Sequence, residues 1–158
     1  MYADMHLHLQ DIPDLQMFKS ILKLAEHLNT GRFVCNGIRP EDWAAVEKIA
    51  SEDRRVVPFY GVHPWYADKV TPGWYEQLEG FLKRRPDAGI GESGLDKSRQ
   101  VDLARQTEVL HRELELAGRL NRPIAFHCVR AWSDLVGILK RNLPAKLRFM
   151  VHSFQGSS

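Results

Sequence analysis

The chain has 158 residues, of which 44% are hydrophobic and 27% are charged. This composition is typical of one globular domain and excludes disordered, collagenous and coiled-coil proteins. No run approaches the ~18 apolar residues that a membrane span needs. The opening MYADMHLHLQ also lacks the basic start and apolar run of a signal peptide. We therefore expect a cytoplasmic protein with no membrane contact.

Charge and cysteine content exclude little else. The net charge of +2 indicates nothing by itself about nucleic acid. The two cysteines, Cys35 and Cys128, lie in separate apolar runs without a CxxC companion. We expect buried, reduced thiols rather than a disulfide or a zinc-binding pair.

Short runs of branched and aromatic residues alternate along the chain with longer stretches of helical spacing. The predicted strands span residues 2–9, 33–38, 56–62, 88–92, 123–128 and 147–152. The predicted helical stripes between them span residues 15–25, 43–50, 74–82, 103–117 and 132–139. Because strands joined through helices lie parallel, the sequence predicts consecutive βαβ units.

Each predicted strand ends near a polar residue, and these residues recur about every 29 positions: His8, Asn36, His63, Glu92, His127 and His152. This period fits a doubly wound sheet or a (β/α)8 barrel of the TIM type, and both folds bind ligands at the carboxyl ends of their strands. No glycine-rich nucleotide motif follows a strand, which favours the barrel.

An eightfold barrel usually takes ~250 residues, so this chain corresponds to about six β/α units. We expect one domain over residues 1–158 that is incomplete at its C-terminus, completed by another polypeptide or rearranged at its open edge. Open strand edges also favour self-association.

Five of the seven histidines are expected at the carboxyl ends of strands: His6, His8, His63, His127 and His152. His27 and His111 fall within helices, where we expect surface or packing roles. Neutral imidazoles that converge with a carboxylate commonly bind a metal ion. The pattern therefore predicts a metal site on this rim.

The first strand contains the most specific part of this pattern. In DMHLH, alternation places Asp4, His6 and His8 on one face, so that both imidazoles can reach one ion. Met5 and Leu7 are expected in the opposite packing layer.

The fourth strand ends in the glycine-rich segment GIGESGLD, which places Glu92 at the rim. Opposite the two histidines, Glu92 is the natural anionic ligand and can bridge two cations. His63, before Pro64, is expected to contact substrate rather than a metal. Asp96 is given a supporting role, while Arg130 is either a contact for an anionic group or a surface residue.

These motifs resemble the TatD family of metal-dependent hydrolases. The family's motifs occur here in order, and together they cover nearly the whole chain: DMHLH at 4–8, GVHPW at 61–65, GESGLD at 91–96, RPIAFHC at 122–128 and VHSFQGS at 151–157. The resemblance implies a (β/α)8 barrel, one or two divalent ions (zinc, manganese or magnesium) and phosphodiester hydrolysis, commonly as a DNase.

The resemblance also implies residue roles. His6, His8, Glu92, His127 and His152 match the family's metal ligands, and His63 matches a rim histidine associated with substrate. With two ions, His6 and His8 would hold one, His127 and His152 the other, and Glu92, the expected catalytic residue, would bridge them while a bound water attacks phosphorus.

Two positions depart from the family pattern. Many members have arginine at the second position after the fifth-strand histidine, where this chain has Val129 followed by Arg130. The family's aspartate after the eighth strand has no counterpart through Ser158. We therefore expect residues 1–158 to bind ions with strongly reduced turnover.

Other functions remain open. One alternative is an amidohydrolase acting on C–N bonds, but such enzymes often bridge their ions with a modified lysine, whereas the fourth strand of this chain offers Glu92. A second is a phosphoesterase of the PHP type, which would not explain GVHPW and GESGLD together. An inactive metal-binding remnant is the non-enzyme alternative. Within phosphodiesters DNA is the expected substrate, although Trp65 is the only tryptophan expected at the mouth, since Trp43, Trp74 and Trp132 fall on core-facing stripes.

Overall fold

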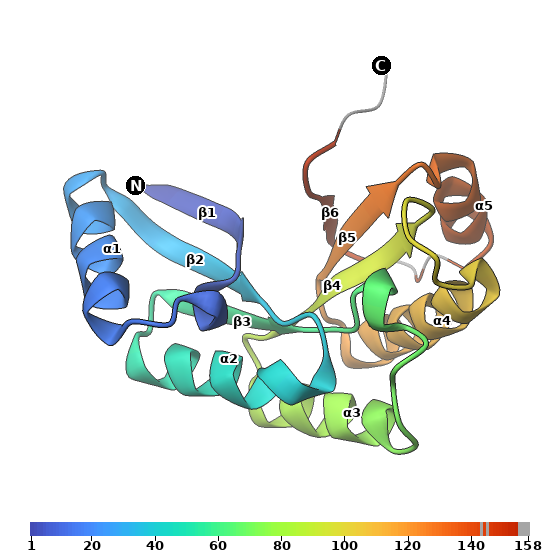
Figure 1. Cartoon of the computed structure of the whole chain (residues 1–158), viewed down its shortest axis with the longest axis horizontal. Coiled ribbons are helices and arrows are strands. Elements are labelled where there is room, and N and C mark those ends of the chain that lie inside the picture. The colour runs from blue at the N-terminus through green and yellow to red at the C-terminus, as the bar shows by residue number, and fades with distance from the viewer. Residues whose placement is uncertain (143, 145, 155–158) are drawn as a thin grey trace.

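A computed structural model describes residues 1–142, 144 and 146–154, apart from the side chain of Leu15 (Figure 1). All six predicted strands are present, and each is parallel to its neighbours: β1 (Tyr2–Leu7), β2 (Thr30–Asn36), β3 (Val56–Tyr60), β4 (Gly89–Asp96), β5 (Ile124–Val129) and β6 (Phe149–Val151). They form one sheet in the order β1-β2-β3-β4-β5-β6. A doubly wound sheet reverses its strand order at a switch point, so this sequential order confirms the barrel type.

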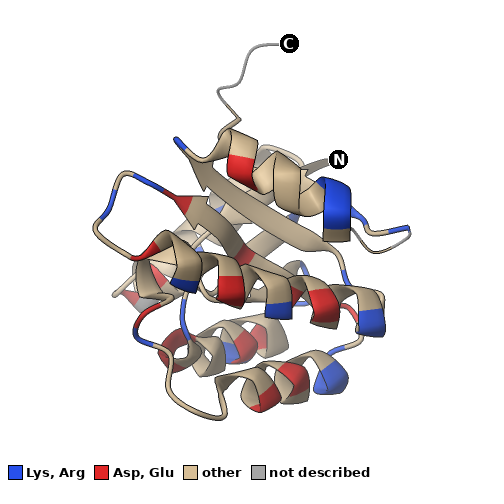
Figure 2. Cartoon of the chain, turned by 90° about the vertical axis from the view of Figure 1, so that its right-hand side faces the viewer, with Lys and Arg blue, Asp and Glu red and all other residues tan. Residues whose placement is uncertain are grey.

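Helices connect the strands along the outer side of the curled sheet (Figure 1). They are α1 (Leu15–His27), α2 (Pro40–Glu52), α3 (Trp74–Arg84), α4 (Leu103–Leu120) and α5 (Trp132–Asn142). Figure 2 shows acidic and basic residues interspersed along the helices of one side of the molecule. This mixture is typical of a solvated outer surface.

Several element ends differ from the sequence prediction. β1 ends at Leu7, and His8 precedes the short 3-10 helix η1 (Leu9–Asp11). The pairing of β1 with β2 is irregular between Asp4 and Leu7, so simple alternation fails there. β4 continues to Asp96, beyond the predicted end at Glu92, because its last residues pair with β5.

The core lies between the outer face of the sheet and the helices. Trp43, Trp74 and the other apolar residues of the helical stripes pack there against the strands. Cys35 and Cys128 are buried as free thiols, as predicted, and burial raises the pKa of each to about 11. A smaller cluster of Val34, Phe59 and Ala125 forms a second apolar group.

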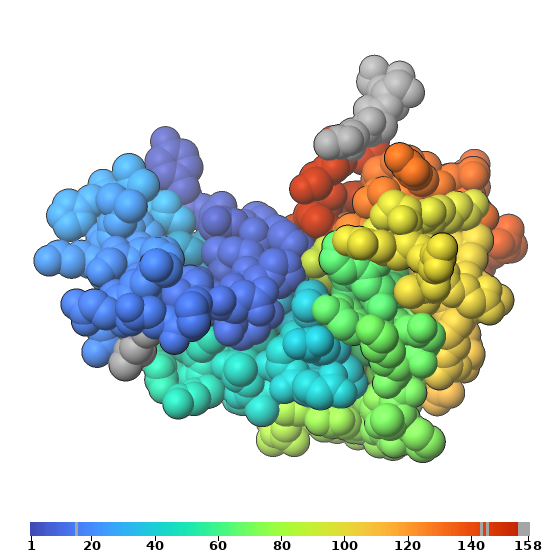
Figure 3. Space-filling view, in the orientation of Figure 1, coloured from blue at the N-terminus to red at the C-terminus, as the bar shows by residue number. Residues whose placement is uncertain are grey.

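The two edge strands of the sheet, β1 and β6, lie on either side of an open notch. Figure 3 shows this notch between the N-terminal and C-terminal parts of the molecule. Met5 and Leu7 were both expected to pack on the face of β1 opposite the histidines. Leu7 does pack against the core, whereas the side chain of Met5 is 50% exposed. Among the described residues, no helix is long and apolar enough to cross a membrane.

Candidate metal centre

A cavity of about 320 Å³ opens at the carboxyl ends of the strands. It contains all five predicted strand-end histidines and the predicted carboxylate. Its lining residues are His6, His8, Asp11, Ile38, His63, Trp65, Tyr66, Glu92, His127 and His152. The sheet therefore brings together side chains that lie as much as 146 positions apart in the sequence.

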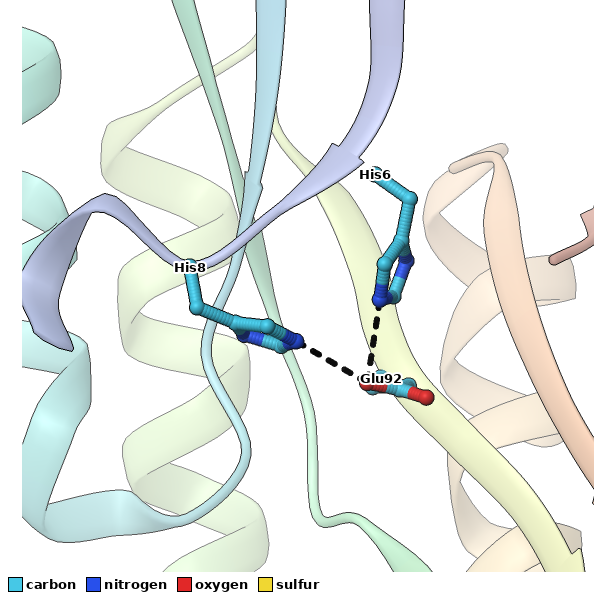
Figure 4. A group of neighbouring side chains, drawn as sticks. All are labelled: His6, His8 and Glu92. Carbon is cyan, nitrogen blue, oxygen red and sulfur yellow. Dashed lines mark ion pairs between the residues drawn. The ribbon is translucent and has the colours of Figure 1, made fainter. Parts of the chain in front are cut away.

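Glu92 lies at the centre of the histidines and is only 3% exposed. Its Oε2 atom is 3.4 Å from Nε2 of His6 and 3.4 Å from Nε2 of His8 (Figure 4). The two imidazoles of the DMHLH motif thus point at one carboxylate oxygen. Asp4 does not join them: it is exposed and accepts a hydrogen bond from the backbone N–H of His6.

The second oxygen of Glu92 faces the other three histidines. Oε1 is 3.0 Å from Nδ1 of His127 and 3.7 Å from Nε2 of His63, and it also contacts Nε2 of His152. His127 Nδ1 and His152 Nε2 are 3.2 Å apart. Each carboxylate oxygen therefore has its own group of imidazole nitrogens.

Glu92 is ionised in this environment. Burial opposes its charge, but the contacts with His127, His152, His6 and His8 hold the pKa of Glu92 well below its usual range. In turn, the hydrogen bond with Glu92 raises the pKa of His8. The cavity thus combines one buried negative charge with imidazoles that face it.

Partners outside the cavity fix the tautomers of two histidines. His8 Nδ1 is 2.8 Å from the backbone carbonyl of Asn36, which can only accept, so Nδ1 carries the proton of the neutral ring. His127 Nε2 is 2.9 Å from a carboxylate oxygen of Asp96, so this nitrogen carries the proton of His127. The remaining nitrogen of each ring faces Glu92 and carries either a lone pair or a second proton, and the hydrogen bond with Glu92 raises the pKa of His8 and, against the effect of burial, that of His127. Lone pairs and a carboxylate repel one another unless a proton or a cation lies between them.

The distances are also those of a metal site. Ligand atoms held at ~2.0–2.2 Å from one tetrahedral ion lie ~3.3–3.6 Å from each other. Two groups place their ligand atoms within 4.8 Å of one another: His6, His8 and Glu92, and His63, Glu92 and His127. The donor set, its geometry and the neutral tautomers of His8 and His127 therefore fit one or more divalent cations.

The sequence relationship agrees with this geometry. Residues 3–158 match the sequence model of the family described as TatD related DNase. The chain belongs to the TatD-related DNase family. Its fold and its motifs are those expected from the resemblance.

Two relatives illustrate the range of named activities within this family. The uncharacterized metal-dependent hydrolase YjjV of Escherichia coli is 30% identical over 160 residues, which cover 99% of this chain and 61% of YjjV. The 3'-5' ssDNA/RNA exonuclease TatD of Pantoea ananatis is 31% identical over 98 residues, covering 61% of this chain and 38% of that protein. This chain thus spans about three fifths of the length of YjjV.

Solved structures of TatD proteins share the fold. The crystal structure of YjjV superposes with a TM-score of 0.90 at 30% identity, over 99% of this chain and 61% of the YjjV chain. A TatD family hydrolase from Entamoeba histolytica gives a TM-score of 0.89 at 22% identity, over 99% and 59% of the two chains. The six strands and five helices described in this chain therefore adopt part of the barrel arrangement of the TatD fold.

Arg130 lies apart from the histidine cluster. It follows β5 with a φ of +54° and an exposed side chain, and it does not line the cavity. Its contact with an anionic substrate group stays a prediction. Residues 155–157 of the VHSFQGS motif lie outside the described part of the chain.

Three residues contact the site in ways that the sequence did not predict: Asn36, Asp96 and Glu113. Asn36 holds His8 through its carbonyl, and its side-chain Nδ2 is 3.3 Å from Nδ1 of His6. Asp96 holds His127, and the buried Glu113 accepts a hydrogen bond of 2.7 Å from the backbone N–H of Val62, next to His63. Asn36 belongs to the period of polar residues and Asp96 follows Glu92 in the GESGLD motif, but their partners depend on the pairing between strands.

Proposed function

We propose that this chain carries the metal centre of a divalent-metal-dependent phosphodiesterase that acts on nucleic acid, with DNA as the preferred substrate. The observation that carries the proposal is the convergence of five histidines on the ionised Glu92, with the outer nitrogens of His8 and His127 held by other partners so that their inner nitrogens face the carboxylate. A proton or a cation must lie between these nitrogens and Glu92, and membership of the TatD family, one of nucleases and metal-dependent hydrolases, favours the cation.

We assign the ligands to two neighbouring sites that share Glu92. His6 and His8 face Oε2, and His127 and His152 face Oε1, so one carboxylate serves both pairs. Imidazole favours zinc, whereas carboxylate and phosphate oxygens favour magnesium and manganese. The site therefore suits one or two ions drawn from zinc, manganese and magnesium.

His63 has a different role in this proposal. Its Nδ1 accepts a hydrogen bond of 3.2 Å from the backbone N–H of Trp65, so its Nε2 carries the proton and points into the cavity. Burial lowers the pKa of His63 to about 3, which keeps the ring neutral. His63 thus offers an N–H donor rather than a lone pair, which suits a phosphoryl oxygen better than a metal.

In this proposal, Glu92, Asp96 and His63 have separate roles in hydrolysis. When bound, a divalent ion supplies an activated water nucleophile and offsets charge on the phosphoryl oxygens. Glu92 contacts both histidine pairs, and Asp96 keeps His127 in the orientation and tautomer that leave its inner nitrogen free. His63 donates to a substrate oxygen and helps to orient the phosphodiester.

Metal content tests the ligand assignment directly. The purified chain is dialysed against zinc, manganese or magnesium and then against metal-free buffer, and bound metal is measured by plasma mass spectrometry. We expect the His6→Ala, His8→Ala double variant to lose at least one ion per chain. The matched control is His27→Ala with His111→Ala, which also removes two imidazoles, neither of which lines the cavity. Equal metal content in the double variant and the wild type would refute the assignment.

Hydrolysis tests the reaction. A labelled single-stranded oligodeoxynucleotide is incubated with each metal-loaded protein, and Glu92→Gln serves as the inactive control. We expect cleavage that depends on Glu92 and on metal, with a turnover strongly reduced in a preparation limited to residues 1–158. The absence of metal-dependent cleavage, or cleavage that survives Glu92→Gln, would contradict the proposal.

We also propose that residues 1–158 act as one domain and self-associate through the open edges of the sheet. The exposed edge of β1 and the apolar side chains beside it support this association. A cytoplasmic location remains a prediction from the sequence.

A further inference from the structure

Trp65 stands at the lip of the metal cavity. It lies in the short 3-10 helix η2 (Pro64–Tyr66), lines the cavity together with Glu92 and is 37% exposed. Its indole N–H donates a hydrogen bond of 2.7 Å to Asp96, the same carboxylate that holds His127. The orientation of the indole is therefore tied to the orientation of a metal-site histidine.

The other tryptophans have packing positions. Trp43 is 0% exposed and Trp74 is 8% exposed, and both belong to the core. Trp132 is partly buried and packs against Phe154. Of the four tryptophans, only Trp65 lines the cavity. Packing of the core therefore does not account for its position.

Cations surround Trp65 and its neighbour Tyr66. The guanidinium of Arg99, in the loop after β4, lies 4.4 Å from the centre of the Trp65 ring. Tyr66 also lines the cavity, and it carries Arg39 at 5.0 Å and Lys69 at 5.3 Å from its ring centre. Consecutive aromatic rings with adjacent cations are the arrangement that binds single-stranded nucleic acid, because bases stack on the rings and phosphates pair with the cations.

We propose that Trp65 is a base-stacking platform for single-stranded nucleic acid, which holds the nucleobase next to the phosphodiester in the metal cavity. Arg99 leaves the indole when the base arrives and pairs with a neighbouring phosphate. This inference rests on the proposed function, because it concerns the substrate of the same cavity. A base within a duplex is already stacked on both faces, so the platform favours single strands.

Two oligonucleotides separate base stacking from phosphate contact. A phosphorothioate octathymidylate and an abasic phosphorothioate of equal length carry the same charge, resist cleavage and can be titrated against the metal-loaded protein by fluorescence anisotropy. We expect Trp65→Ala to weaken octathymidylate binding by roughly 5- to 100-fold and to leave the abasic strand unchanged. Trp65→Phe should retain most of the octathymidylate affinity, which also controls for folding.

Arg99 is tested separately. We expect Arg99→Gln to weaken the binding of both oligonucleotides to the same extent. The slope of log affinity against log salt concentration should fall by about the amount that one phosphate contact contributes. Arg141→Gln, an exposed arginine near the end of α5, is the matched control and should have no such effect. If Trp65→Ala lost affinity equally for both oligonucleotides, or lost none for octathymidylate, the stacking role of Trp65 would be overturned.

The outcomes distinguish this inference from the proposed function. Trp65-dependent binding of octathymidylate without metal-dependent cleavage of an ordinary oligonucleotide would support the platform and contradict the nuclease. Cleavage whose KM is unchanged in Trp65→Ala would support the nuclease and overturn the platform.

Discussion

Asp96 holds His127 through a contact of 2.9 Å between Oδ2 and Nε2. Hydrogen bonds from Ser98, His127 and Trp65 outweigh the burial of Asp96 and lower its pKa to about 2, so Asp96 is an anionic acceptor at neutral pH. In its neutral form the imidazole therefore places its proton toward Asp96 and its lone pair toward Glu92. The tautomer that can bind a metal is thus selected by a residue that does not contact the metal position.

Replacing Asp96 by Asn should weaken metal binding. The amide can donate to His127 Nε2, which moves the ring proton to Nδ1 and blocks the atom that faces Glu92. We expect a loss of ~10- to 100-fold in affinity for the His127 site. Competition with a chelating dye measures this affinity. Asp134→Asn, which removes a carboxylate paired with Lys97, is the control and should bind metal as the wild type does.

Glu113 predicts a pH dependence of stability. Its carboxyl is fully buried, and burial raises its pKa to about 8 despite hydrogen bonds from Ser93 and Val62. The ordinary pKa is 4.5, so the folded protein retains a proton that the unfolded chain releases between pH 4.5 and 8. This contribution to stability is fully present below pH 4.5 and is lost as the pH rises through 8, at no more than ~1.4 kcal/mol per pH unit.

Urea denaturation over this pH range compares the wild type with Glu113→Gln. The amide keeps an acceptor for the Val62 N–H and a donor for Ser93, but it does not titrate. We expect a flatter pH profile of unfolding free energy in Glu113→Gln. Glu115→Gln on the exposed side of the same helix should retain the slope of the wild type. Identical slopes for the Glu113 variant and the wild type would contradict the prediction.

The sequence was sufficient for the order of elements and for bringing the five histidines and Glu92 to one end of the sheet. Apolar runs locate all six strands, and polar residues at their carboxyl ends identify the five histidines and Glu92 that line one cavity. These features are local, because each depends on the alternation of side chains within one strand.

The contacts between side chains on neighbouring strands could not be predicted from the sequence. Asn36 meets His8 because β1 and β2 pair in a register that is itself irregular between Asp4 and Leu7, and no local pattern encodes that irregularity. For the same reason the expected grouping of Asp4 with His6 is wrong. The tautomers of His8 and His127 could be inferred only when their partners on neighbouring strands were known.

Two glycines predict different costs of substitution. A Cβ at Gly94, where φ is +137°, would lie 2.0 Å from the carbonyl oxygen of His127. A Cβ at Gly73, where φ is +91°, would meet nothing within 4 Å. We expect Gly73→Ala to cost ~1–2 kcal/mol of stability from backbone conformation alone. Gly94→Ala should cost ~3–5 kcal/mol, because a clash with β5 is added. Chemical denaturation of both variants measures the difference, and equal costs would exclude a close β4–β5 approach.

The open edge predicts association of residues 1–158. A groove of about 510 Å³ lies between the edge strand β1 and α1, and it is lined mainly by apolar side chains, including Leu24 and Leu28, which are 60% and 62% exposed. Unpaired strand edges beside apolar surface favour pairing between chains. We expect the sedimentation coefficient to rise with protein concentration, and Leu24→Lys with Leu28→Lys to suppress that rise. Met17→Lys is the control, since Met17 is similarly exposed on α1 but does not line the groove. Equal suppression by Met17→Lys would place the contact elsewhere on α1, and a concentration-independent coefficient in the wild type would rule out the association.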